Sequence, residues 1–283
     1  MTGPFVDSHV HFWDPARLSY GYLSSLPSIS ARHDTATLTA EAGPDGPAQC
    51  VFVQAECDRT QWLDEVRWIE RLARDDARLA AIVAHVTVDA PGTLAAHLDE
   101  LRRHPLVRGV RHLIQDEADP RFCLRDEFVA GVREAGRRGL SFDVCCRHHQ
   151  LPAVIELVRQ CPSVNFILDH GGKPAIGRGE TEPWNEHIRA LAALPNVTCK
   201  LSGLVTEASP RPPTAATLRP YVAILLETFG PARLLFGSDW PIAKLAATYR
   251  EWVATAAELL AALSNAERDA IFRTNARRVY RLA

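Results

Sequence analysis

The sequence has no excess of charge of one sign. Its 32 Lys and Arg residues nearly balance its 34 Asp and Glu residues, which leaves a net charge of −2 over 283 residues. Binding to nucleic acid or to an anionic membrane needs a basic surface, so this composition argues against both partners. We therefore expect a small or moderately polar molecule as the ligand, with no nucleic acid and no membrane.

Long apolar runs and paired cysteine motifs are also missing. No stretch of 18 apolar residues occurs, and Met1 is followed by polar, Pro and Gly residues, so neither a membrane span nor a secretion signal is predicted. The cytoplasm is the expected location. The seven cysteines include no CxxC pair, and several lie inside apolar runs. Reduced, buried thiols are therefore predicted, not a zinc knuckle or a redox dithiol.

What the sequence does contain is a regular alternation of short apolar runs and longer amphipathic stretches. Eight such pairs in a chain of 283 residues predict a single (β/α)8 TIM barrel spanning 1–283, in preference to a doubly wound sheet. The predicted strands are 5–11, 50–56, 81–88, 107–114, 140–145, 164–170, 197–202 and 233–239. The predicted helices are 60–76, behind a Thr cap, 93–104, 125–139, 150–160, 182–194, 215–230, 247–263 and 264–282.

Histidine and carboxylate side chains occur at the ends of three of these strands. His9 and His11 are two residues apart, so they share one face of the first strand. His170 ends the sixth strand, on the same face as two apolar residues of that strand, and Asp239 ends the eighth. A barrel builds its site at the carboxyl ends of its strands, so we expect the four groups to meet there. For His9 and His11 alone, a buried hydrogen-bonded pair is the alternative.

Two irregular segments, 14–49 and 173–183, also follow strand ends. Loops this long inside a compact domain are usually functional, and both are expected on the rim of the site.

An ordered series of motifs resembles a known family. The motifs are DSHVHFWDP at 7–15, FVQAE at 52–56, GVRHLIQDE at 109–117, FDVCCRHHQLPAV at 142–154, LDHGGKP at 168–174, KLSGL at 200–204, LLFGSDWP at 234–241 and NARRVYRL at 275–282. Together they resemble the amidohydrolase superfamily, its amidohydrolase 2 branch, and within it the sugar-lactonase group typified by L-fuconolactonase and L-rhamnonolactonase. The resemblance implies an enzyme that opens a small sugar-derived lactone.

Lactone hydrolysis needs an activated water, a polarised carbonyl and a protonated leaving oxygen. Asp239 is the expected general base. His9, His11 and His170 either donate directly to the carbonyl oxygen or hold one divalent metal ion, above all zinc. The expected ligands are His9, His11 and Asp239, with His170 or Glu56 in addition, and a site that works without metal stays open.

A second metal ion is not expected. Two-metal members of the superfamily use a Lys or Glu from strand four and a His from strand five, where this chain has Arg111 and His112, then Cys145 and Cys146.

The remaining candidates are expected to contact the substrate. Arg111 and His112 are adjacent, so a regular strand turns only one of them inward. Lys200 either binds substrate oxygens or pairs with Asp239, and a structural ion pair is the alternative for Arg111. The expected substrate-contacting residues are Arg111, His112, Gln54, Lys200, Trp13 and Trp240.

Two further alternatives stay open at this level. For the two tryptophans, packing competes with a role as apolar walls against a sugar ring. For the whole chain, a metal-dependent decarboxylase of the same branch and a non-catalytic ligand-binding barrel are the rival functions.

Overall fold

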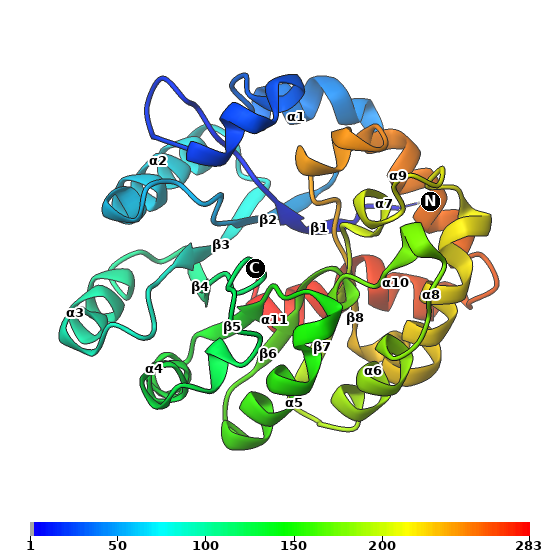
Figure 1. The fold of residues 1–283 in the computed structure, drawn as a ribbon. Helices are drawn as coiled ribbons and strands as arrows, with labels where there is room; N and C mark the ends of the chain where they lie inside the picture. Colours follow the sequence, from blue (N-terminus) through cyan, green and yellow to red (C-terminus); the bar gives the residue numbers. More distant parts are fainter. Residues whose placement is uncertain (1–2) are drawn as a thin grey trace.

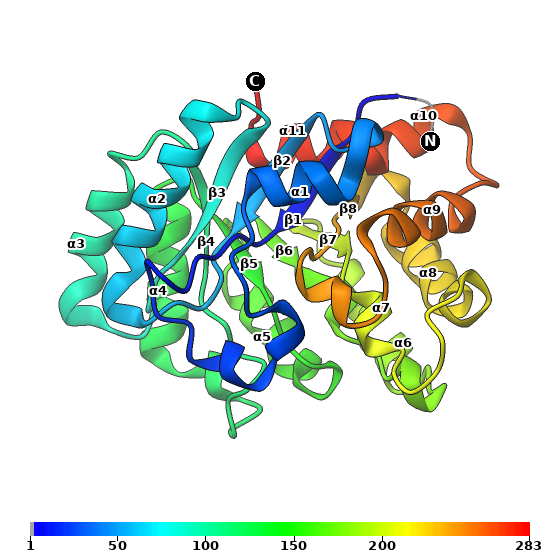
Figure 2. The ribbon, with the colours of Figure 1, turned by 90° about the horizontal axis from the view of Figure 1, so that it is seen from above.

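The structure is a computed structural model that describes residues 3–283, and it forms a parallel barrel surrounded by helices (Figure 1, Figure 2). The strands pair in chain order, each parallel to the next, so the chain returns through the outer helical layer after every strand. This confirms the predicted (β/α)8 barrel. The strands are β1 (Val6–Val10), β2 (Gln49–Val53), β3 (Leu79–His85), β4 (Val107–Arg111), β5 (Ser141–Val144), β6 (Phe166–Leu168), β7 (Val197–Leu201) and β8 (Leu234–Phe236).

Each predicted helical stretch contains a helix, with two corrections. Asp58, not a threonine, accepts the N–H of Thr60 ahead of the second helix. The segment 264–282 is interrupted by a π-helical turn at Ala270–Thr274. The helices at 35–42, inside the segment expected to be irregular, and at 204–207 are not among those predicted. The helices are α1 (Thr35–Ala42), α2 (Trp62–Asp75), α3 (Pro91–Leu101), α4 (Asp126–Arg137), α5 (Leu151–Gln160), α6 (Trp184–Ala192), α7 (Leu204–Glu207), α8 (Ala215–Phe229), α9 (Tyr249–Leu259), α10 (Asn265–Asp269) and α11 (Asn275–Tyr280).

Strand residues alternate between two buried layers. Val51, Val83 and Ile167 fill the inside of the barrel together with Tyr280 of α11. Their neighbours, such as Phe52, pack against the helices. Because successive side chains of a strand point to opposite faces, both layers come from the same short apolar runs.

All seven cysteines are free and buried, as predicted from their positions in apolar runs. None of the helices within residues 3–283 combines the length and the apolar character needed to cross a membrane.

The strands end earlier than the apolar runs predict, so His11, His170 and Asp239 lie in the loops that follow them. The face predicted for His170 is wrong for this reason. Phe166 and Leu168 pack on the helical side of the sheet. After Leu168 the backbone leaves the strand, and His170, at φ 55°, turns back toward the other histidines.

The barrel closes between β8 and β1 through a buried carboxylate. Asp7 accepts the N–H groups of Ser238 (2.8 Å) and His9 (3.2 Å) and the hydroxyl of Tyr249 (3.1 Å). The N–H of Asp239 donates to the carbonyl oxygen of His9 at 2.8 Å. These bonds fix the loop that carries Asp239 against the strand that carries His9.

Candidate functional site

A cavity of about 530 Å³ opens where the carboxyl ends of the strands meet. Its lining includes the predicted residues His11, His170 and Asp239. The two irregular segments reach it as predicted, the first through Tyr22 and the second through Lys173. The cavity therefore occupies the position where barrel enzymes build their active sites.

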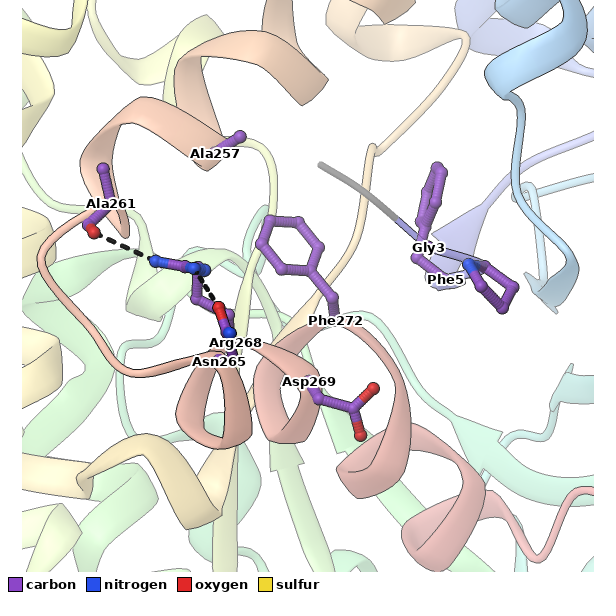
Figure 3. A pocket seen from close by; sticks show the side chains of 9 residues that line it. Gly3, Phe5, Ala257, Ala261, Asn265, Arg268, Asp269 and Phe272 are labelled. Carbon is purple, nitrogen blue, oxygen red and sulfur yellow. Dashed lines mark hydrogen bonds between the residues drawn. The ribbon is translucent and has the colours of Figure 1, made fainter.

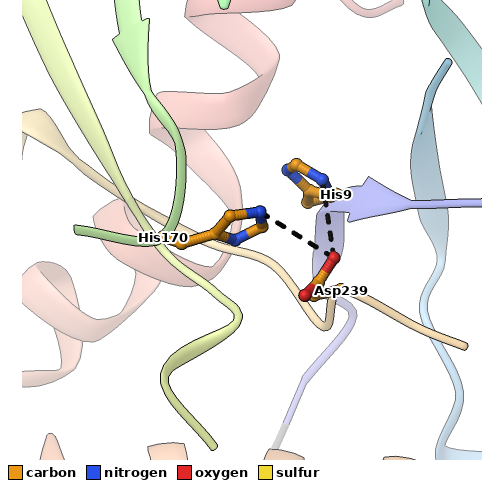
Figure 4. Close-up of side chains that lie close together, drawn as sticks. All are labelled: His9, His170 and Asp239. Atoms are coloured by element: carbon orange, nitrogen blue, oxygen red, sulfur yellow. Dashed lines mark ion pairs between the residues drawn. The ribbon is translucent and has the colours of Figure 1, made fainter. Parts of the chain in front are cut away.

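Four polar groups converge at this cavity. The Nε2 atoms of His9 and His11 lie 3.2 Å apart. Asp239 Oδ1 lies 3.3 Å from Nε2 of His11, 3.7 Å from Nε2 of His9 and 3.9 Å from Nε2 of His170. Figure 4 shows His9 and His170 directed toward the Asp239 carboxylate. The structure thus brings together all four residues that the sequence places at strand ends.

The Nδ1 atoms of His11 and His170 are held by hydrogen bonds to neighbouring residues. His11 Nδ1 lies 2.8 Å from the carbonyl oxygen of Val53, which can only accept, so Nδ1 carries the proton. His170 Nδ1 lies 2.9 Å from the hydroxyl of Ser202. Such contacts fix the ring orientations and direct Nε2 of both imidazoles toward Asp239.

His9 rests on a buried ionic network. Its Nδ1 lies 3.2 Å from Asp169 Oδ1 and 3.1 Å from Lys200 Nζ. Lys200 also pairs with Asp143 at 2.6 Å and with Asp169 at 2.9 Å, and Arg111 donates to Asp169 at 3.1 Å. Lys200 therefore pairs with these two carboxylates, and not with Asp239.

The electrostatic environment sets the charges of the site near neutral pH. Burial and Lys200 hold the pKa of His9 well below its usual range, and burial lowers that of His170 to about 4, so both imidazoles are neutral. Burial raises the pKa of Asp239, but His170, His11 and His9 outweigh it and hold the pKa well below its usual value. The site thus presents one carboxylate among imidazoles.

The donor set fits one divalent ion. Tetrahedral zinc with bonds of about 2.0–2.1 Å places its ligand atoms about 3.3 Å apart. The ligand atoms of His9, His170 and Asp239 lie within 4.8 Å of one another, and Nε2 of His11 lies 3.2 Å from Nε2 of His9 and 3.3 Å from Asp239 Oδ1. Gly203 (φ 62°) leaves room for them, because a Cβ there would lie 2.5 Å from His170 Nδ1 and 3.1 Å from Asp239 Oδ2.

Glu56 and Gln54 follow β2 and contact each other. Gln54 Nε2 donates to Glu56 Oε1 at 2.5 Å, and Gln54 Oε1 accepts the N–H of Glu56 at 2.8 Å. Glu56 lines the cavity, whereas Gln54 is fully buried behind it. Gln54 is therefore placed to orient Glu56.

Of the adjacent pair Arg111 and His112 at the end of β4, Arg111 is the residue that turns inward. It lines the cavity, and it donates to Asp169 and to the carbonyl oxygen of Gln54 at 2.7 Å. His112 faces the helical side, with its ring 5.8 Å from Phe122 and 5.3 Å from Phe128.

Trp13 and Trp240 are fully buried behind the cavity wall. Trp13 donates to the carbonyl oxygen of Ile29 at 3.0 Å, and its ring packs edge-on against Tyr22, which lines the cavity. Trp240 donates to Glu41 at 2.8 Å. Trp13 thus supports the cavity wall from behind, and neither tryptophan is among the residues that line the cavity.

The family model described as amidohydrolase matches residues 6–282. The chain belongs to the amidohydrolase family. It is 39% identical to an L-fucono-1,5-lactonase of Burkholderia multivorans, over 98% of this chain and 96% of the relative. An L-fucono-1,5-lactonase of Burkholderia ambifaria is 34% identical, with 88% and 85% covered. A crystal structure of an amidohydrolase from Burkholderia multivorans with bound zinc superposes with a TM-score of 0.89 at 35% identity, covering 99% of this chain and 100% of that chain.

Two buried carboxylates of this amidohydrolase are not among the residues that the sequence predicts for the site. Asp169 and Asp143 are fully buried and pair with Lys200. The sequence carries a signal for Asp169, because it is two residues beyond the inward-facing Ile167 and is thus expected on the inner side of the barrel. In the LDHGGKP motif only the neighbouring His170 is predicted as a site residue.

Glu65 of α2 is a buried carboxyl group beneath the cavity wall of the amidohydrolase. Its Oε1 accepts the N–H of Ala55 at 3.0 Å. Burial raises its pKa from the ordinary 4.5 to about 8, so it is protonated at neutral pH. Because the folded protein binds this proton more tightly than the unfolded chain, Glu65 contributes stability below about pH 4.5 that is lost as the pH rises to about 8.

A glutamine at this position tests that linkage. Glu65→Gln keeps an oxygen for Ala55 and cannot ionise. We expect the unfolding free energy of the wild type to fall relative to the variant between about pH 4.5 and 8, by at most about 1.4 kcal/mol per pH unit. Urea unfolding of both proteins across this range measures the difference. Parallel stability curves would contradict a buried neutral carboxyl group at Glu65.

A second cavity of about 310 Å³ lies at the amino-terminal end of the amidohydrolase barrel, beside residues 3–5 and α10 (Figure 3). Its charged groups are engaged locally. Arg268 donates to the carbonyl oxygen of Ala261 at 3.0 Å and to Asn265 Oδ1 at 2.5 Å, and Asp269 pairs with Arg273 at 2.7 Å. The reactive constellation therefore belongs to the opposite end of the barrel.

Proposed function

We propose that the protein hydrolyses a sugar-derived lactone of the L-fucono or L-rhamnono type. The observation that carries this proposal is the Asp239 carboxylate within 3.9 Å of three imidazole Nε2 atoms at a cavity of about 530 Å³. The names of the two relatives from Burkholderia support the substrate class. A cavity of this volume accommodates a single sugar ring.

In this proposal Asp239 is the general base. Its carboxylate takes a proton from the attacking water as the water oxygen bonds to the lactone carbonyl carbon, and it returns the proton to the ring oxygen as that bond breaks. A positioned base of this kind contributes on the order of 10²- to 10⁴-fold in rate. Its depressed pKa keeps the carboxylate ionised at neutral pH.

His9, His11, His170 and Asp239 are the residues proposed to hold one zinc ion. When bound, the ion polarises the carbonyl and lowers the pKa of a water molecule. The protein contributes rigid imidazoles whose Nδ1 atoms are anchored on Val53, Ser202 and the buried ionic network.

His9 can also serve without an ion, because its Nδ1 has two partners. With the proton on Nδ1, it donates to Asp169 and leaves a lone pair on Nε2. With the proton on Nε2, its Nδ1 accepts from Lys200 and Nε2 can donate to the lactone carbonyl oxygen. Both modes of carbonyl polarisation are therefore available to the same side chain.

An indicator assay of acid release tests the proposal. A panel of aldono-1,4- and 1,5-lactones is offered to the protein as purified and after chelation, with metal content measured on both samples. We expect hydrolysis of a deoxysugar lactone. Activity that survives chelation would assign direct donation to the imidazoles, and activity lost with one ion per chain would make them ligands. Silence across the panel would refute the lactonase and favour a decarboxylase or a binding barrel.

A further inference from the structure

Lys173 shares a backbone signature with the residues of the proposed catalytic centre. Within residues 3–283, five non-glycine residues have positive φ, and four of them line the cavity: Glu56 (54°), His170 (55°), Lys173 (49°) and Asp239 (60°). Such conformations cost about 1–3 kcal/mol each in a non-glycine residue and cluster at functional sites. The fifth, Arg281 (52°), follows α11 at the other end of the barrel.

The backbone of Lys173 is fixed while its ammonium group is not tightly paired. Its N–H donates to the carbonyl oxygen of His170 at 3.0 Å, and its own carbonyl oxygen faces Nδ1 of His148 at 3.1 Å. The ammonium nitrogen lies 3.8 Å from Glu207 Oε1, beyond hydrogen-bond distance, and the side chain is 17% exposed. Backbone contacts that any residue could make hold this lysine in the lining of the cavity.

Two cationic side chains line the cavity, and Lys173 is the one that is less engaged by neighbouring groups. Arg111 is the other cationic side chain in the lining, and Asp169 and the carbonyl oxygen of Gln54 engage it. An ordinary lysine ammonium group is protonated at neutral pH.

The chemistry of ring opening requires such a cation. A neutral lactone acquires negative charge on its acyl oxygens as water adds, and it becomes a carboxylate when the ring carbon–oxygen bond breaks. The carboxylates of Glu56 and Asp239 line the same cavity and would repel that charge. A cation beside the developing anion stabilises the transition state more than it stabilises the substrate.

We propose that Lys173 is a further catalytic residue, whose ammonium group stabilises the negative charge that forms on the acyl oxygens and then binds the product carboxylate. This inference rests on the proposed lactonase function. The water oxygen bonds to the acyl carbon, the ring carbon–oxygen bond breaks, and the proton held by Asp239 moves to the ring oxygen. The acid formed loses its proton to solvent, and Lys173 keeps its protons throughout.

Replacement by glycine separates catalysis from folding. Glycine adopts a positive φ without strain, so Lys173→Gly is expected to match or exceed the wild type in thermal stability. Its kcat is expected to fall about 10²- to 10³-fold, as on loss of one oxyanion donor, with KM changed less than about threefold. Lys173→Met, which keeps the strain and loses the charge, is expected to lose kcat equally.

Arg281→Gly is the matched control, because it relieves the same kind of strain away from the cavity. It is expected to keep wild-type kcat and KM. A kcat of Lys173→Gly within about threefold of the wild type would overturn the proposal, since loss of one oxyanion donor costs far more.

Binding of sodium L-fuconate, followed by calorimetry, tests the lysine independently of turnover. We expect the dissociation constant to rise at least about tenfold in Lys173→Gly, as for a lost charge-assisted contact. Equal binding by both proteins, or no binding by the wild type, would overturn the role of Lys173. Wild-type protein that binds L-fuconate through Lys173 but hydrolyses no lactone would refute the proposed function alone.

Discussion

Asp239→Asn is expected to lower kcat by about 10³-fold while the protein folds normally, because the amide keeps the shape of the side chain and cannot accept the proton of water. The N–H of Asp239, which closes the seam between β8 and β1, is unaffected by the change. Lactone hydrolysis followed by acid release measures the rate, and thermal unfolding measures the fold.

The control for this variant is Asp64→Asn. Asp64 lies in the first turn of α2 with its side chain 63% exposed, and its contact with Arg67 is 3.9 Å long. This substitution removes one carboxylate of equal size without touching the cavity, so kcat is expected to stay at the wild-type value. Near-normal turnover by Asp239→Asn would remove the general base from the proposed mechanism.

The fold could be predicted from the sequence because its signal is repeated eight times. Each apolar run is short, carries inward and outward residues in alternation, and is followed by an amphipathic stretch. Val51 and Phe52 of β2 illustrate this, since neighbours in one run fill the two different layers. The π-helical turn that interrupts the helix predicted over 264–282 could not be predicted from the sequence, because it leaves the spacing of the apolar residues nearly intact.

The site could be predicted only as far as strand alternation holds. His9 lies inside β1, and its relation to His11 follows from their spacing. His170 and Asp239 were placed at the correct strand ends, but their side chains are aimed by positive φ angles after the strands. Residues beyond β2, such as Glu56, also turn in this way, and no periodicity in the sequence encodes those turns.

Long-range ionic partners could not be predicted at all. The partners of Lys200 come from β5 and from the turn after β6, and their meeting depends on barrel closure. A lysine in an apolar run is equally compatible with a substrate contact, which is what its position indicated. The structure instead makes Lys200 the centre of a fully buried network with Asp143 and Asp169.

This network predicts the largest stability effect in the chain. Lys200→Met is expected to lower the unfolding free energy by about 3–5 kcal/mol, because it leaves Asp143 without its cation in a fully buried position. Tyr280, which donates to Asp143 at 2.8 Å, cannot neutralise that charge. Urea unfolding at pH 7 measures the loss, and a loss below about 1 kcal/mol would contradict the network.

The double variant Lys200→Met with Asp143→Asn separates charge balance from packing. It removes the orphaned charge and keeps an oxygen for the Tyr280 hydroxyl, while Asp169 still faces Arg111 at 3.1 Å. We therefore expect it to be more stable than Lys200→Met alone by at least about 1 kcal/mol, a non-additivity typical of residues in one network.

The His9 Nδ1 contact with Lys200 is absent in both variants, so His9 is restricted to donating to Asp169. Nitrogen chemical shifts of His9 in the double variant are then expected to report the proton on Nδ1, and a proton on Nε2 would show that Asp169 does not orient the ring.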